Sequence, residues 1–315
     1  MKLFKKYAEI QLIDRVTDIM REPEVIVTEK LHGINVRIGW VDGRFRIGSR
    51  NEEFNYAGSS PNSSSGFMGW VRGSGLAEKL EELAGSIQSE VIFYGEWFGP
   101  GVQGKCIPYC REKQLRVFDV RIDEEFIDWD RVVELAGRIG LKTVPLLYRG
   151  RPDQAVFDEL RDAPSTVARE NGVGSVEDVG EGIVIKPTIM HRNYSGGDWV
   201  IAKYKSPKFS ERKSLAEGKA ALVTPASAIE FVEEFFTAVR LEHVLSNLVM
   251  AGVDIFSRTA VGQIIKVMYD DVIKESGPEL DQLDEDSREA VDKIHGRKTK
   301  SLLDGALADW KLVVI

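Results

Sequence analysis

The sequence predicts an α+β protein of two domains, a sheet-rich domain of residues 1–214 and a small, mostly helical domain of residues 215–315. Three observations lead to this prediction. A chain of 315 residues is long enough to bury two hydrophobic cores. Its first two-thirds holds short alternating or apolar segments typical of strands, with helical segments between them. Beyond about residue 215 the apolar residues recur at helical spacing, and few strand signals remain.

The strands expected in the first domain follow from alternation and turn signals. Residues 25–28 form a predicted strand that ends at Glu29-Lys30. The Asp-Gly pair at 42–43, between residues 35–41 and 44–50, predicts a hairpin. Further strands are expected at residues 91–97, 115–122, 143–148, 182–186 and 199–205, with helices at 76–87 and 130–139.

The second domain carries helical periodicity throughout. Helices are expected at residues 226–250, 259–275, 284–295 and 301–310. Thr224-Pro225 suits the start of the first helix, as an N-cap followed by a proline in the first turn. No internal repeat is visible in the sequence.

The charge distribution leaves nucleic-acid binding open although the net charge is −8. Residues 1–214 hold 31 basic and 32 acidic side chains, whereas residues 215–315 hold 11 and 18. Nucleic-acid binding depends on local cationic strips rather than on the charge of the whole chain. The segment 203–213 contains such a strip, which a solvated basic face would explain equally well.

The cellular location is expected to be cytoplasmic. No apolar run approaches the roughly 20 residues of a membrane span, and the N-terminus lacks a secretory core. Cys106 and Cys110 cannot form a disulfide framework, which favours a reducing compartment.

The first indication of function is a lysine at the end of a predicted strand. Lys30 stands three residues before Gly33, which allows a tight turn. A lone K-x-x-G is weak evidence, because a solvated lysine explains most copies. The evidence becomes stronger because several short segments follow in order, each on or beside a predicted strand. They are Ser49-Arg50, residues 94–99 with Glu96, residues 117–120 with Phe118, residues 181–186 with Glu181 and Lys186, and residues 202–205 with Lys203 and Lys205.

Taken in order, these segments resemble the motifs of the covalent nucleotidyltransferases, which include DNA ligases, RNA ligases and mRNA capping enzymes. The closest resemblance is to the bacteriophage T4 RNA ligase 2 family, which includes RNA-editing ligases. It spans about residues 30–205. It implies a nucleotidyltransferase domain, related to ATP-grasp ligases, of antiparallel sheets with flanking helices. A small helical C-terminal domain is usual in that family.

The resemblance also implies catalytic roles. Lys30 would attack the α-phosphate of ATP, expel pyrophosphate and carry AMP covalently. Lys203 and Lys205, alternate residues of one strand, share a face and would neutralise the developing phosphate charge. An edge-strand pair of solvated lysines is the plain alternative.

Nucleotide and metal contacts are implied for the remaining motif residues. Glu96 would contact the ribose, Glu181 would assist the metal, and the two are the candidate ligands of Mg²⁺ or Mn²⁺, which prefer oxygen. Phe118 would stack on adenine. Asn35, Arg37 and Arg50 are the candidate contacts to ATP phosphates, ribose or the 5′-phosphate end, and Lys186 would add a phosphate contact. Glu29 and His32 are further candidate cofactor-binding residues. Without the motifs, ordinary surface carboxylates and a core phenylalanine would explain these residues.

The implied function is an ATP-dependent RNA ligase that joins 3′-hydroxyl and 5′-phosphate ends of RNA, at nicks or bridged junctions. His32 favours RNA over DNA, because DNA ligases and capping enzymes usually carry Asp there. The helical tail points the same way, because those enzymes usually continue into an OB barrel of short strands. The alternatives are DNA ligation, GTP-dependent cap transfer, or a non-ligating homologue that binds RNA or nucleotide.

Overall fold

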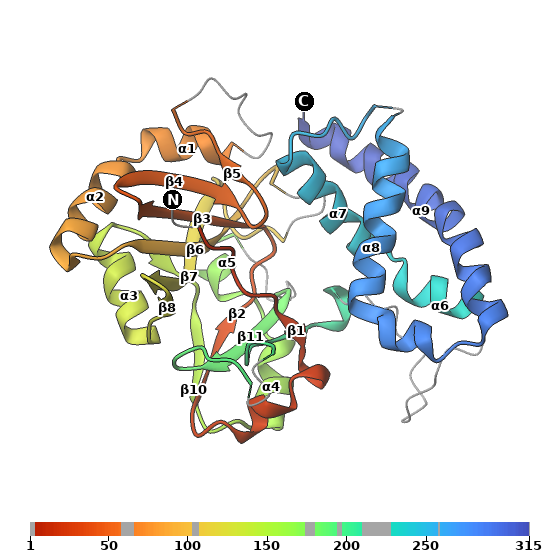
Figure 1. The fold of residues 1–315 in the computed structure, drawn as a ribbon, viewed down its shortest axis with the longest axis horizontal. Helices are drawn as coiled ribbons and strands as arrows, with labels where there is room; N and C mark the ends of the chain where they lie inside the picture. The colour runs from red at the N-terminus through yellow and green to blue at the C-terminus, as the bar shows by residue number, and fades with distance from the viewer. Residues whose placement is uncertain are drawn as a thin grey trace. The chain divides into compact units, whose positions relative to one another are not determined.

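The structure is a computed structural model that describes residues 4–57, 66–102, 107–173, 180–193, 197–209, 228–257 and 259–314 (Figure 1). The described residues divide into two compact units, the first ending at Ser206 and the second beginning at Pro207. The expected domain boundary after residue 214 and the Thr224-Pro225 start signal lie outside the described residues. Two sheets with flanking helices followed by a helical region confirm the predicted α+β class.

A five-stranded sheet forms the lower part of the first unit as drawn in Figure 1. Its strand β11 is antiparallel to both β2 and β12, and β2 is antiparallel to β10. Strand β1 joins the other edge in parallel with β12. In spatial order the strands are β1 (Gln11–Leu12), β12 (Ala202–Lys205), β11 (Gly182–Pro187), β2 (Val25–Glu29) and β10 (Leu146–Gly150).

A seven-stranded sheet forms the other part of this unit. The predicted hairpin is confirmed, because β3 and β4 pair antiparallel on either side of residues 42–43. The strands in spatial order are β5 (Glu53–Phe54), β4 (Arg44–Ser49), β3 (Ile34–Val41), β6 (Val91–Phe98), β7 (Gln114–Ile122) and β8 (Glu125–Phe126), with β9 (Lys142–Thr143) beside β7. All these pairs are antiparallel except β7 with β9.

The single strand expected at residues 143–148 is wrong. The chain forms β9 in the seven-stranded sheet and then β10 in the five-stranded sheet. Val144 still donates its N–H to the carbonyl of Val117, whereas Pro145 offers only its carbonyl, which accepts from the N–H of Glu29. Because proline has no N–H to continue the first ladder, the crossing between sheets occurs there. The strand expected at 199–205 is shorter, since regular pairing begins at residue 202.

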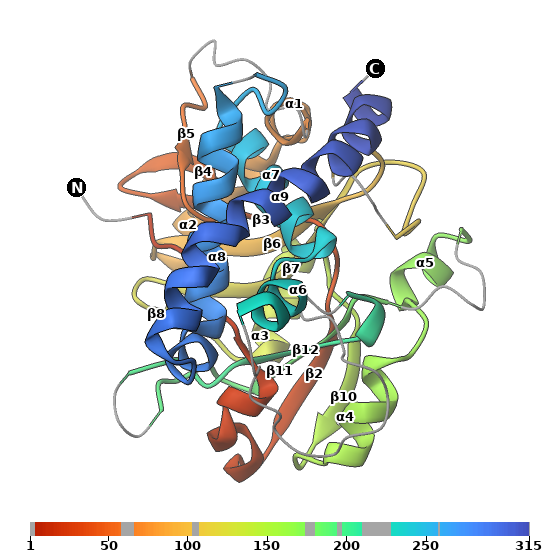
Figure 2. The same ribbon diagram turned by 90° about the vertical axis from the view of Figure 1, so that its right-hand side faces the viewer.

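Helices cover both sheets of the first unit (Figures 1 and 2). Helices α2 and α3, both predicted, pack against the seven-stranded sheet, and α4 packs against the five-stranded one. The side chain of Asp128 caps the N-terminus of α3, and Asp153 caps that of α4. The helices are α1 (Phe67–Gly73), α2 (Leu76–Ile87), α3 (Trp129–Arg138), α4 (Gln154–Arg161) and α5 (Thr166–Glu170), with short 3₁₀ turns at Ile13–Arg15 and Thr17–Arg21. A further 3₁₀ turn, Pro207–Phe209, begins the second unit.

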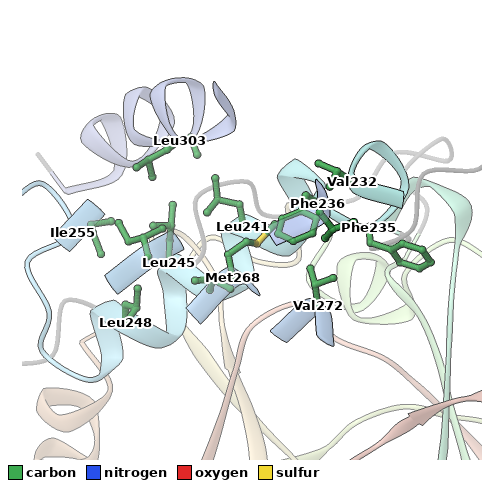
Figure 3. Packing of buried hydrophobic residues seen from close by; sticks show 14 of the residues in the cluster. Val232, Phe235, Phe236, Leu241, Leu245, Leu248, Ile255, Met268, Val272 and Leu303 are labelled. Atoms are coloured by element: carbon green, nitrogen blue, oxygen red, sulfur yellow. The ribbon is translucent and has the colours of Figure 1, made fainter. Parts of the chain in front are cut away.

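The second unit consists, over its described residues, of helices around one apolar core. Figure 3 shows this core, which includes Phe236 from the turn after the first helix, Leu241 and Leu245 from the second, and Met268 and Val272 from the third. The helices are α6 (Ala228–Phe235), α7 (Ala238–Met250), α8 (Ala260–Asp281, kinked at Ser276) and α9 (Glu285–Val314). Among the described residues, none of the helices combines the length and apolar character needed to cross a membrane.

Two helix predictions in this unit are corrected. The helix expected at 226–250 is broken, because Thr237 has extended backbone and its side chain accepts from the N–H of Arg240, which starts α7. The helices expected at 284–295 and 301–310 are one continuous helix, α9. Between the two predicted segments, the buried position 299 is occupied by the polar Thr299, which interrupts the apolar stripe. Its hydroxyl donates to the carbonyl of His295 one turn earlier.

Candidate active site

A pocket lies between the two sheets of the first unit. One wall comes from β2 and β11, and the other from β3, β6 and β7. The lining residues are Tyr7, Ile10, Thr28, Glu29, Lys30, Leu31, Asn35, Glu96, Phe118, Val144, Val184 and Lys186. The tertiary structure therefore brings together segments that are up to about 180 positions apart in the sequence.

Lys30 sits where β2 ends, and the backbone of β11 fixes its position. Its N–H donates to the carbonyl of Gly182 at 2.9 Å, and its Nζ donates to Oε1 of Glu181 at 2.7 Å. Gly182 has φ +140°, and a Cβ there would meet the carbonyl oxygen of Tyr204 at 2.2 Å. Only glycine allows β12 to approach this closely, so Gly182 keeps the strand ends around Lys30 together.

The turn after Lys30 is held against β6. A Cβ on Gly33 would meet the carbonyl oxygen of Trp97 at 2.4 Å, so the glycine permits this contact. The N–H of His32 donates to the hydroxyl of the buried Tyr109 at 2.9 Å. These contacts bring the Lys30 turn beside Glu96, which precedes Trp97 on β6.

Glu181 is the electrostatic centre of the site, with 1% of its surface exposed. Its Oε1 lies 2.7 Å from Nζ of Lys30 and 3.5 Å from Nζ of Lys205. Its Oε2 lies 3.7 Å from Nδ1 of His32. Burial disfavours the charged carboxylate, but Lys30, Lys205 and His32 outweigh it and hold the pKa of Glu181 well below its usual range. Glu181 is therefore ionised at neutral pH.

Glu96 has the opposite character. Burial raises its pKa to about 8, and the negative charge of Glu181 adds to the rise, while Lys30 only partly offsets it. The site therefore holds one ionised carboxylate and one that is mostly protonated at pH 7. Pairs of carboxyl groups with divergent pKa values are typical of functional sites.

Phe118 and Lys186, two of the residues predicted to contact the nucleotide, both line the pocket. Lys186, a candidate phosphate ligand, is engaged in the pocket wall. Its Nζ pairs with the buried carboxylate of Asp119 and donates to the carbonyl of Phe118 at 3.0 Å. The buried ion pair thus anchors the backbone of the aromatic residue.

The candidates on β3 and just after β4 lie in different surroundings. Asn35 lines the pocket, and the N–H of Arg50 donates to its carbonyl at 3.0 Å. Arg37 is not among the lining residues. It is 3% exposed, its Nη1 donates to the carbonyl of Phe4 at 2.6 Å, and its guanidinium stacks on the Phe4 ring. Arg50 reaches the carbonyl of Ala8 with Nη2 at 3.3 Å.

Two further candidates, Glu29 and Lys203, differ in their relation to the pocket. The carboxylate of Glu29 accepts hydrogen bonds from the Ser165 hydroxyl and from the N–H groups of Thr166 at 3.0 Å and Val167 at 3.1 Å. It therefore anchors the start of α5, although Glu29 also lines the pocket. Lys203 is half-buried on β12, opposite Val184 of β11 in the strand register, and is not among the lining residues.

The oxygen donors of the site fit a divalent cation. Oε2 of Glu181 and Oδ1 of Asn35 are buried and accept no hydrogen bond from any described residue. Glu96 lies in the same pocket as Asn35. Carboxylate and amide oxygens suit Mg²⁺ or Mn²⁺, which bind through one or two carboxylates together with substrate phosphates.

Several residues in and around the pocket were not predicted from the sequence, among them Tyr109, Asp119 and Tyr7. Tyr109 supports the Lys30 turn, Asp119 pairs with Lys186, and Tyr7 lines the pocket. Asp119 directly follows Phe118 and could have been found by its place in that motif. Tyr7 and Tyr109 stand in no periodic pattern that points to the site.

These features define a protein with a pocket between two sheets, a strand-end lysine and two buried carboxyl groups with divergent pKa values. A family model described as RNA ligase matches residues 23–205. The match covers more than half of the chain, and the chain belongs to the RNA ligase family.

Solved structures similar to this chain include the Naegleria gruberi RNA ligase with PPi. That match has 17% identity and a TM-score of 0.48, and it covers 65% of this chain and 57% of the other. A variant of the same ligase with ATP and Mn matches at 17% identity and TM-score 0.48, covering 66% and 58%. Another variant with ATP and Mn matches at 16% identity and TM-score 0.49, again covering 66% and 58%. This chain thus spans less than two-thirds of the length of those ligases. No curated protein matches it in sequence.

Proposed function

We propose that this protein is an ATP-dependent RNA ligase of the bacteriophage T4 RNA ligase 2 type, with AMP carried on Lys30. One observation carries the proposal. The amine of Lys30 lines a pocket between two sheets that also holds Phe118 and Glu96, and it lies 2.7 Å from the ionised Glu181. Membership of the RNA ligase family supports the same chemistry.

In the first proposed step, Nζ of Lys30 loses a proton and attacks the α-phosphorus of ATP. A nitrogen–phosphorus bond forms, and the bond to pyrophosphate breaks. Phe118 offers a ring against which adenine can stack, and Glu96 is placed for the ribose. AMP then passes to a 5′-phosphate end of RNA, and attack by a 3′-hydroxyl seals the ends and releases AMP.

The charges around Glu181 suit this transfer. Lys205 is buried beside Glu181 at the end of β12, so a cation already stands next to the amine that reacts. A fixed cation stabilises the charge that develops on the phosphoryl oxygens without reorganisation. Mg²⁺ or Mn²⁺ held by Glu181, Asn35 and Glu96 would supply Lewis-acid stabilisation of the same oxygens.

RNA is the proposed substrate because of the family and because of two sequence features. The first is His32, at the position where DNA ligases and capping enzymes usually carry Asp; its side chain is buried against Glu181. The second is the helical C-terminal part of the chain. The described residues after 227 are helical and contain no strand, whereas an OB barrel would require several. The proposed substrate is a nick or bridged junction with 3′-hydroxyl and 5′-phosphate ends, and the proposed location is the cytoplasm.

Covalent labelling tests the first step. The protein is incubated with α-labelled ATP, GTP or NAD and a divalent cation, and acid-quenched samples are separated on a denaturing gel. The proposal expects label from ATP on the wild-type protein and on Lys142→Ala, a control at an exposed lysine, but none on Lys30→Ala. Label from GTP alone would instead favour cap transfer, and absence of label from any nucleotide would favour a binding protein.

Sealing of nicked duplexes tests the substrate. Duplexes carry RNA or DNA on each side of the nick, and sealing is measured with the wild-type protein and with Lys30→Ala. The proposal expects RNA nicks to be sealed faster than DNA nicks. Lys30→Ala is expected to seal a strand that already carries 5′-AMP, since only the first step needs the amine. Preferential sealing of DNA would contradict the proposal.

A further inference from the structure

The segment of residues 4–10 forms part of the pocket although it precedes the region matched by the family model, which begins at residue 23. Tyr7 and Ile10 are lining residues from this segment. Tyr7 is only 5% exposed, so its side chain is committed to the interior of the first unit.

Tyr7 contacts both the ring of Phe118 and the buried ion pair of Asp119 with Lys186. Its ring centroid lies 4.7 Å from that of Phe118, with the planes at 64°, an edge-to-face arrangement. Its hydroxyl donates to Oδ2 of Asp119 at 2.6 Å. The same oxygen pairs with Lys186, which in turn donates to the carbonyl of Phe118. Ring, hydroxyl and ion pair therefore form one closed set of contacts around Phe118.

Strands of the seven-stranded sheet hold this segment in place through its backbone carbonyls. Arg37 on β3 donates to the carbonyl of Phe4, and the hydroxyl of Tyr94 on β6 donates to that of Lys5 at 3.0 Å. Arg50, just after β4, donates to the carbonyl of Ala8 at 3.3 Å. Because these donors flank Tyr7 on both sides, its position is fixed by the sheet that carries Phe118.

The hydroxyl of Tyr7 is a permanent donor. Burial raises its pKa well above the usual value, and the negative charge of Asp119 adds to the rise. Burial also raises the pKa of Asp119, while Lys186 and the hydroxyl of Tyr7 oppose this. The Asp119 carboxylate thus depends on two donors, one of them from the N-terminal segment.

We propose that Tyr7 is a positioning residue for nucleotide binding. Its ring holds Phe118 in the orientation that stacks on the base, and its hydroxyl completes the Asp119–Lys186 pair behind it. The wall is then formed before the nucleotide enters, so ordering it costs no binding free energy. This inference rests on the proposed function, since the ligand is taken to be ATP.

The test separates nucleotide binding from the chemical step. Rates of protein adenylylation are measured against ATP concentration under single-turnover conditions for Tyr7→Phe and Tyr7→Leu. Tyr7→Leu is expected to raise the half-saturating ATP concentration by about 10-fold, and Tyr7→Phe by about 3-fold, with the maximal rate changed less than about 3-fold. The control is Tyr148→Phe, whose hydroxyl donates to the carbonyl of Arg151 and which does not line the pocket. It should behave as wild type.

The outcomes distinguish this inference from the proposed function. If wild-type protein forms no adenylate, the proposed function fails and this inference fails with it. If wild-type protein is labelled and both Tyr7 variants show unchanged half-saturation, only the inference is overturned. A fall in the maximal rate with unchanged half-saturation also overturns it. Thermal unfolding is recorded for each variant, and Tyr7→Phe decides the matter if Tyr7→Leu does not fold.

Discussion

The amine of Lys30 and the carboxylate of Glu181 lie 2.7 Å apart although 151 positions separate them in the sequence. Lys30 follows β2, and Glu181 precedes β11, its antiparallel neighbour. The pair therefore exists because two strand ends meet at one edge of the five-stranded sheet. Lys205, at the end of β12, lies 3.5 Å from the same carboxylate, so the charged groups at this end of the sheet come from three neighbouring strands.

Glu181→Gln is expected to destabilise the protein. The substitution leaves the ammonium groups of Lys30 and Lys205 without their buried counter-charge, which should lower the free energy of unfolding by about 2–4 kcal/mol at pH 7. Chemical denaturation measures the loss. Glu82→Gln, at an exposed position of α2, is the matched control and should change the stability little.

The depressed pKa of Glu181 predicts that the stability difference between wild type and Glu181→Gln depends on pH. Because the folded pKa of Glu181 is depressed, its contribution is present above the unfolded pKa of about 4.3. It is lost as the pH falls towards the folded pKa. The stability difference between wild type and Glu181→Gln should therefore be constant from pH 6 to pH 7 and shrink below about pH 4.3. A difference that grows in acid would contradict the electrostatic account.

Glu96→Gln is expected to show the opposite dependence in metal-free buffer. With a folded pKa of about 8 and an unfolded pKa near ~4.3, wild-type Glu96 binds more protons when folded between these values. Wild-type stability should then fall, relative to Glu96→Gln, as the pH rises from about 5 to 8. Urea unfolding at several pH values measures this change, which should reach a few kcal/mol. Parallel pH curves for the two proteins would show that Glu96 is not held protonated.

Removal of the Glu29 carboxylate is expected to loosen the start of α5. Glu29→Ala deprives the Ser165 hydroxyl and the N–H groups of Thr166 and Val167 of their acceptor, at a cost of about 2–3 kcal/mol. Amide hydrogen exchange should accelerate at Thr166 and Val167. Ser165→Ala is the comparison. It removes one donor to Glu29 and the side-chain cap that accepts from the N–H of Ala168, and it should cost about 1 kcal/mol. Equal protection of both amides in Glu29→Ala and wild type would refute this role.

Arg240→Ala is expected to destabilise the helical unit. Arg240 is 2% exposed, and it pairs with Asp271 at 2.7 Å and Glu275 at 3.2 Å, both on α8. Breaking this buried network should cost about 3 kcal/mol in chemical denaturation. Lys293→Ala breaks an exposed pair with Glu289 and should cost no more than about 1 kcal/mol. Equal losses in the two variants would mean that burial does not set the strength of these pairs.

Much of the fold follows from local patterns. The hairpin at 42–43 and the helix at 76–87 are observed where alternation and helical spacing predict them. The split of residues 143–148 between two sheets was not predictable, because alternation does not say which sheet a strand joins. Nor was the unbroken α9, because a buried polar Thr299 looks like the end of an apolar stripe.

In the candidate site, too, some features follow from the sequence and others do not. Ordered motifs predict Lys30, Glu96 and Phe118 as site residues, and all three line one pocket. The direction of the Glu29 carboxylate and the stacking of Arg37 on Phe4 depend on segments that carry no motif. Since a side chain turns towards whichever partner the fold places beside it, sequence spacing cannot decide these orientations.

The sequence by itself determined which chemical groups this protein possesses and where along its strands they stand, because periodicity and turn residues act over short distances. Only the tertiary structure decided the charge states of Glu181 and Glu96. Burial raises the pKa of Glu96, whereas Lys30 and Lys205, at the ends of the two strands that flank β11, and His32 lower that of Glu181. These effects depend on neighbours that are distant in sequence, so they arise only when the two sheets have packed together.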